Sequence, residues 1–67
     1  MSAVVVHTAR EVVKMLKKNG FHEVSIRGDH HKFINAKGIS IVVPYSTLKS
    51  TIAPGTYNAI LHQAGLK

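Results

Sequence analysis

Residues 21–35 read FHEVSIRGDHHKFIN, and this stretch contains two predicted strands joined by a tight turn. Residues 21–27 are predicted to be a strand, because Val24 and Ile26 alternate with Glu23, Ser25 and Arg27, and a period of two residues is typical of a half-buried strand. Gly28 and Asp29 follow as a turn signal. A second strand is predicted over residues 30–35. The stretch therefore favours a β-hairpin whose turn carries glycine and a carboxylate.

A third strand is predicted after this hairpin. Residues 36–38 form a short loop, and residues 39–43 are almost entirely apolar. Pro44 ends the strand, because proline cannot donate a hydrogen bond to a strand ladder. Three successive strands with short turns between them should form an antiparallel sheet.

The segment before the sheet is predicted to be an amphipathic helix over residues 8–19. Thr8 with Glu11 three residues later is a capping-box pattern, and Gly20 provides the left-handed stop. Apolar side chains recur on one side at the helical spacing of 3.6 residues. The opposite side carries four cations, which are Arg10, Lys14, Lys17 and Lys18.

The segment after the sheet ends in a second helix. Residues 45–53 form a polar connection without a clear period, and the helix begins near Pro54, Gly55 and Thr56. The element order is therefore α-β-β-β-α, an α+β fold. We expect a three-stranded antiparallel sheet with both helices on one face and solvent on the other. This layout is that of the double-stranded-RNA-binding fold.

The composition narrows the class of protein. The chain has 67 residues, and we expect one domain over residues 1–67. Nine Lys and Arg against three acidic residues give a net charge of +6, which favours a polyanionic partner, nucleic acid first. With no cysteine, a disulfide scaffold and a thiolate zinc site are excluded, and a cytoplasmic location is expected. No apolar run is long enough for a signal peptide or a membrane span.

His30 is the candidate catalytic residue. Histidine titrates near neutral pH and serves as general acid or base on a ribose hydroxyl. Phe33 should face the helices, which places His31 on its side of the strand and His30 with Lys32 on the open face. His31 is then a half-buried supporting residue. The alternative is that the two histidines are solvated surface residues without a catalytic role, which is the commoner outcome for two adjacent histidines on a strand.

Cations and turn residues around His30 are candidate phosphate contacts. Arg27 and Lys32 flank it in sequence, and the four cations of the first helix are placed to follow phosphates. For each helix cation, an ordinary solvated surface is the simpler interpretation. Gly55 and Thr56 open the second helix, where free N–H groups either hold a phosphate or merely begin the helix. We expect no cofactor and no metal, since the remaining histidines lack ligand spacing.

The chain resembles the HicA family of toxins from bacterial toxin–antitoxin pairs. The likeness spans residues 8–66 and rests on the order of several blocks: Gly28-Asp29-His30 before an aromatic, Pro54-Gly55-Thr56, and the ending ILHQAGL. The resemblance implies the double-stranded-RNA-binding-like fold and cleavage of mRNA that arrests growth. It also implies a HicB-like antitoxin, expected to cover the His30 face. The family's catalytic histidine falls on His30 and its glycine on Gly28.

Asp29 departs from the family pattern, which usually has serine there. A carboxylate beside His30 either supports the imidazolium form or repels phosphate, so it bears on rate more than on fold. The expected function is thus a metal-independent endoribonuclease toxin, for which RNA itself supplies the 2′-hydroxyl nucleophile. Two alternatives remain open: a non-catalytic RNA-binding module of the same fold, and a protein-interaction domain for an acidic partner.

Overall fold

The computed structural model describes residues 6–66, which fold into two helices and five strands. Their order along the chain confirms the predicted α-β-β-β-α core and adds one short strand before each helix. The elements are β1 (His7–Thr8), α1 (Ala9–Lys18), β2 (His22–Arg27), β3 (His30–Ile34), β4 (Ser40–Pro44), β5 (Thr51–Ile52) and α2 (Pro54–Gln63).

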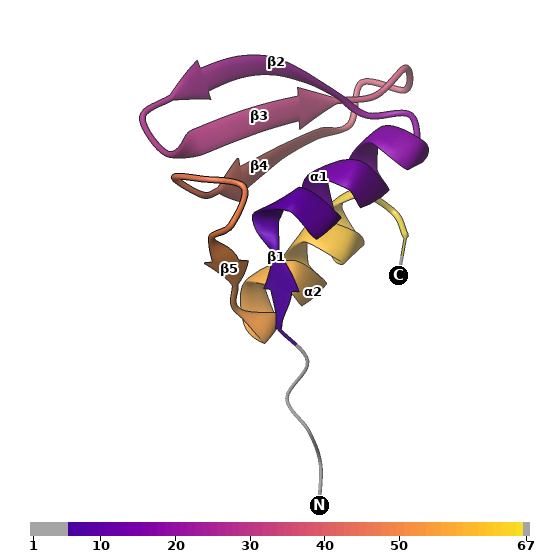
Figure 1. Ribbon diagram of the computed structural model, residues 1–67. Coiled ribbons are helices and arrows are strands. Elements are labelled where there is room, and N and C mark those ends of the chain that lie inside the picture. Colours follow the sequence, from indigo (N-terminus) through magenta and orange to yellow (C-terminus); the bar gives the residue numbers. More distant parts are fainter. Residues whose placement is uncertain (1–5, 67) are drawn as a thin grey trace, which may run out of the picture.

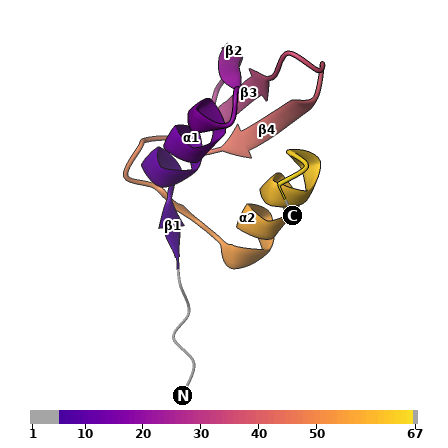
Figure 2. The same ribbon diagram turned by 90° about the vertical axis from the view of Figure 1, so that its right-hand side faces the viewer.

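Strands β2, β3 and β4 form one antiparallel sheet in that order. Both helices lie on the same side of it, and the other side is open to solvent, as predicted (Figures 1 and 2). Within residues 6–66, neither helix is long enough and apolar enough to cross a membrane.

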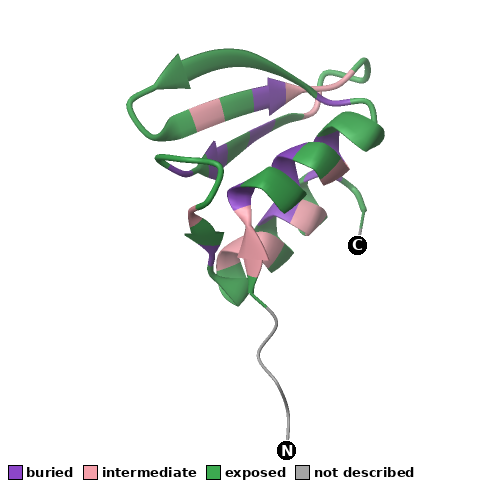
Figure 3. Ribbon diagram, viewed as in Figure 1, coloured by how far each residue is buried: buried purple, intermediate pink, exposed green. Residues whose placement is uncertain are grey.

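The core lies between the sheet and the two helices (Figure 3). Phe33, the largest fully buried side chain, points from β3 toward the helices, and Ile41 lies directly opposite it on β4. Leu16 from α1 and Ile60 from α2 are buried against this layer. Alternation along β4 explains the packing, since Ile41 and Val43 are buried while their neighbours are exposed.

Two strands of two residues each were not predicted. Residues 45–53 were expected to be a connection without regular structure, but β5 lies within them and pairs antiparallel with β1. The pairing joins the beginning of α1 to the segment that leads into α2. A strand of two residues is too short to show an alternating pattern, so the sequence carried no signal for it.

Strand β2 is more exposed than its alternating pattern indicates. All six of its residues are exposed, including Val24 and Ile26. The strand lies at an edge of the sheet, and its register against β3 shifts between Glu23 and Ser25. Such a bulge leaves an extra residue without a cross-strand partner and bends the strand. Val24 falls at this shift, and Ile26 lies opposite His31 but is 57% exposed, so neither apolar residue of β2 joins the core.

The predicted capping box at the start of α1 is present. The Thr8 hydroxyl accepts from the Glu11 N–H at 3.3 Å, and a Glu11 carboxylate oxygen accepts from the Thr8 N–H at 3.3 Å. The second carboxylate oxygen lies 3.3 Å from His7 Nδ1. The Thr8 backbone first, and His7 second, hold the pKa of Glu11 below its ordinary value of 4.5.

This lowered pKa predicts an acid-dependent loss of stability. The ionised Glu11 stabilises the folded state fully above its unfolded pKa near 4.5, and the effect is lost as the pH falls through the lower folded pKa. The Glu11→Gln variant should therefore be less stable than the wild type at neutral pH, with a difference that shrinks toward pH 3. Thermal melting from pH 7 to pH 3 measures it, and a difference independent of pH would contradict the assignment.

Candidate active site

His30 lies in a shallow depression on the open face of the sheet. In an antiparallel pair, directly opposed residues point to the same face. Arg27 is opposite His30, and Lys32 is opposite both Ser25 on β2 and Val42 on β4. These five residues line the depression. The register thus brings one imidazole and two cations together on a surface that substrate reaches without any opening of the fold.

Asp29 lies directly beside the His30 ring. Its Oδ1 is 3.1 Å from His30 Nδ1, and the two side chains are 62% and 64% exposed. The other ring nitrogen, Nε2, has no partner among residues 6–66. A carboxylate on Nδ1 favours the tautomer in which Nδ1 carries the proton, so that Nε2 keeps its lone pair.

The turn before His30 needs a glycine. Gly28 has a φ of +60°, a backbone conformation that costs residues with a Cβ about 1 kcal/mol or more. After it, the Asp29 carbonyl accepts a hydrogen bond from the Tyr45 N–H at 2.8 Å. This bond ties the turn to the end of β4. Gly28 and Asp29 thereby set where β3 begins and where the His30 side chain projects.

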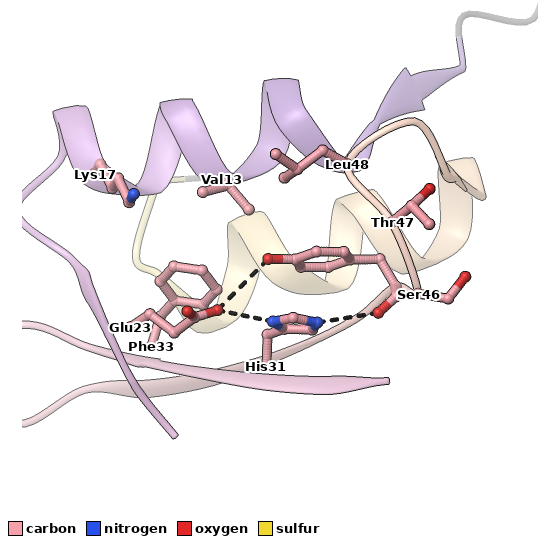
Figure 4. A pocket seen from close by; sticks show the side chains of 9 residues that line it. Val13, Lys17, Glu23, His31, Phe33, Ser46, Thr47 and Leu48 are labelled. Atoms are coloured by element: carbon pink, nitrogen blue, oxygen red, sulfur yellow. Dashed lines mark hydrogen bonds and ion pairs between the residues drawn. The ribbon is translucent and has the colours of Figure 1, made fainter. Parts of the chain in front are cut away.

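His31 lies on the helix side of the sheet, as strand parity predicted. Its Nδ1 is 2.8 Å from Glu23 Oε2, and its Nε2 is 3.1 Å from the Tyr45 carbonyl oxygen (Figure 4). Its ring also stacks on the Tyr45 ring, with 3.6 Å between the centroids. Burial, and secondarily the Glu23 charge, raise the pKa of the Tyr45 hydroxyl above 10.0, so this group stays a neutral donor near neutral pH.

The helix cations line a separate surface. Arg10, Lys14 and Lys17 border a groove whose apolar wall is formed by Val13 and Leu48. Val13, Lys17 and Leu48 also line the pocket that holds His31, whereas none of these residues lines the depression around His30. The structure therefore separates the helix cations from His30, on opposite sides of the sheet.

The remaining candidate residues are not brought to His30. Lys18 is exposed at the end of α1 and lines neither surface. Gly55 and Thr56 lie in the first turn of α2, at the end of the molecule away from the sheet (Figure 1). No three His, Asp or Glu side chains within residues 6–66 come together in a way suited to hold a metal ion.

Comparison with protein families identifies the chain. The family model described as the HicA toxin of bacterial toxin–antitoxin systems matches residues 9–66 of the 67, a span that includes both helices and the whole sheet. The chain belongs to the HicA toxin family. A comparison with curated proteins gave no match. The family assigns the chain to the toxin side of a toxin–antitoxin system.

The three acidic side chains of this HicA-family chain each lie beside a histidine. Glu11 is paired with His7, Glu23 with His31 and Asp29 with His30. Over residues 6–66, no Lys or Arg lies within 4.0 Å of a carboxylate oxygen. The positive charge of the HicA fold is therefore not neutralised by internal ion pairs, and it remains available to an anionic partner.

Two residues of the HicA site region were not found from sequence. Glu23 was assigned only to the polar side of β2, and Tyr45 only to a connection. The bulge in β2 brings Glu23 opposite Phe33, on the helix side with His31. Neither the bulge in β2 nor the stacking of His31 on Tyr45 can be predicted from the spacing of residues. The one indication in the sequence was that Glu23, a carboxylate, lies on the strand next to the one that carries the inward-facing His31.

Proposed function

We propose that this HicA-family toxin is a metal-independent endoribonuclease in which His30 acts as the general base on mRNA. The observation that carries the proposal is the geometry around His30. Its Nδ1 lies 3.1 Å from a carboxylate, its side chain is 64% exposed, and Arg27 and Lys32 line the same depression. A general base, its orienting group and two cations are the parts that this reaction needs.

The proposed step uses the nucleophile already present in RNA. His30 Nε2 takes the proton from a ribose 2′-hydroxyl, and the 2′-oxygen attacks the adjacent phosphorus. The bond from phosphorus to the 5′-oxygen breaks, and that oxygen takes a proton from the solvent at this open face. The products are a 2′,3′-cyclic phosphate and a 5′-hydroxyl. Arg27 and Lys32 stabilise the charge that builds on the phosphate oxygens.

Asp29 has a supporting role in this step. An exposed ion pair contributes about 0.5–1 kcal/mol, which corresponds to roughly two- to five-fold in rate. The Asp29→Ala variant should therefore cleave RNA a few-fold more slowly than the wild type at neutral pH. Asp29→Ser, which restores the usual family residue, should remain active. Initial rates measured from pH 5 to pH 9 test this, and a rate that rises in Asp29→Ala would show that the carboxylate mainly repels phosphate.

The proposed partners follow from the two charged surfaces. RNA binds the open face of the sheet, and the cations of α1 contact phosphates of a strand long enough to pass around the sheet. An antitoxin of the HicB kind inhibits by covering the open face and burying His30. Because mRNA and an antitoxin of this kind are both found in the cytoplasm, the toxin acts there. Protection of Lys32 from chemical labelling in a toxin–antitoxin complex tests the covered face, and unchanged labelling would contradict it.

The experiment that tests the function is RNA cleavage by the purified chain in excess EDTA. Cleavage that EDTA does not reduce supports the proposal. Binding that weakens with salt, together with intact RNA after long incubation, supports the RNA-binding module instead. Absence of both binding and cleavage at low salt supports a protein-interaction domain. A DNA strand of the same sequence serves as control, because it lacks the 2′-hydroxyl and should stay intact.

A further inference from the structure

A continuous set of contacts runs from the helix side of the sheet to the turn that carries His30. Glu23 contacts His31 Nδ1 at 2.8 Å, and His31 Nε2 contacts the Tyr45 carbonyl oxygen at 3.1 Å. The Tyr45 N–H then donates to the Asp29 carbonyl at 2.8 Å. Asp29 precedes His30 and lies against its ring. Glu23, His31, Tyr45 and Asp29 thus connect β2, β3 and the end of β4.

The contacts on His31 are mutually consistent. Both ring nitrogens of His31 lie within hydrogen-bonding distance of an oxygen, Glu23 Oε2 on one side and the Tyr45 carbonyl on the other. The face of the same ring stacks on the Tyr45 ring. The Tyr45 hydroxyl donates to the same Glu23 oxygen at 3.5 Å. Each member therefore restrains the other two.

On the β4 side, the turn where these contacts end has few other restraints. Pro44 lies opposite His30 and has no N–H to donate to β3. The Tyr45 N–H is the backbone donor that reaches the turn from this side. Gly28, two residues before His30, adds backbone freedom rather than restraint. If Tyr45 moves, the Asp29 carbonyl loses this tie to the end of β4, and the turn keeps only its cross-strand pairing with β2, in which Arg27 is opposite His30.

We infer that Glu23, His31 and Tyr45 are positioning residues that fix the direction of the His30 side chain through the Asp29 backbone. They lie on the opposite side of the sheet from the substrate and touch no reacting atom. The expected effect on the rate of RNA cleavage rests on the proposed function. The expected effect on the position of the turn at Asp29 does not depend on it. A shift of His30 by about 1 Å costs up to roughly a hundred-fold in rate.

The chain contains its own matched control. His7 lies 3.3 Å from Glu11 and stacks on Tyr57, with 3.8 Å between the ring centroids. This second cluster has the same three residue types and joins α1 to α2. It has no contact with the turn at Gly28 and Asp29. A merely stabilising role predicts similar effects for both clusters, whereas a positioning role predicts an effect from the first alone.

The test compares Glu23→Ala with Glu11→Ala in the full chain. We expect Glu23→Ala to lower kcat roughly ten-fold or more while KM changes less than about two-fold. Glu11→Ala should leave kcat unchanged once rates are corrected for the folded fraction. Glu23→Gln keeps an oxygen that accepts from His31 Nδ1 and should recover most of the lost rate. Equal effects of the two alanine variants, or a change confined to KM, would overturn the inference.

A second readout does not depend on cleavage. Hydrogen exchange of the Tyr45 amide, followed by NMR, reports the bond to Asp29 directly. Exchange should be roughly ten-fold faster in Glu23→Ala than in the wild type and unaltered in Glu11→Ala. If the wild type cleaves no RNA, the proposed function is wrong and the amide exchange still decides the positioning. Unchanged Tyr45 exchange in Glu23→Ala would overturn the positioning whatever the activity.

Discussion

Replacing His30 by alanine is expected to reduce RNA cleavage by roughly 10²- to 10⁴-fold and to remove growth arrest in cells that express the toxin. The loss follows from the proton transfer that His30 Nε2 performs in the proposed step. The fold should be unaffected, because the His30 side chain is 64% exposed and lies on the open face. Initial rates on a labelled RNA, with melting temperatures measured alongside, give the result.

His22→Ala is the matched control for this variant. His22 lies opposite Ile34, so it points to the same open face as His30 but from the far end of the sheet. It is exposed and has no carboxylate partner among residues 6–66. Its rate should stay within about two-fold of the wild type. Equal losses in the two variants would assign the effect to general surface charge rather than to His30.

Replacing Phe33 by alanine is expected to leave the protein largely unfolded. Phe33 is fully buried at the centre of the sheet face that meets both helices. Removing such a ring typically costs about 3–5 kcal/mol, whereas small domains often have only about 5 kcal/mol of stability in total. Urea unfolding followed by circular dichroism measures the change. The midpoint should fall to a small fraction of the wild-type value.

Ile34→Ala provides the comparison within the same strand. Ile34 is the next residue along β3 and points to the open face, where it is only partly buried. Its replacement should lower the unfolding midpoint far less than that of Phe33. Similar shifts for the two variants would mean that the core does not lie where the alternation of β3 places it.

Alternation along β3 was sufficient to predict which of its side chains face the helices and which face solvent. Because Phe33 had to be buried, His31 had to share its side and His30 had to face solvent. The structure confirms this division, with Lys32 and Arg27 on the His30 side. The start of α1 that its capping residues predicted is likewise confirmed. A capping box can be predicted because it depends only on residues that are close in sequence.

Features that depend on contacts between distant residues were not predictable. The pairing of β1 with β5 joins residues more than forty positions apart and leaves no local period. The contacts of Glu23 with His31 and Tyr45 depend on a bulge in β2. The separation of the α1 cations from His30 depends on which side of the sheet α1 packs. These are consequences of packing rather than of residue spacing.

The central claim is that His30 activates the 2′-hydroxyl of RNA without a metal ion. It is tested most directly by cleavage of a short RNA in excess EDTA, beside the same RNA with 2′-O-methyl groups throughout. We predict that the unmodified strand is cut to fragments ending in a 2′,3′-cyclic phosphate and that the methylated strand stays intact. Cleavage of the methylated strand, or fragments that carry a 5′-phosphate, would contradict the account.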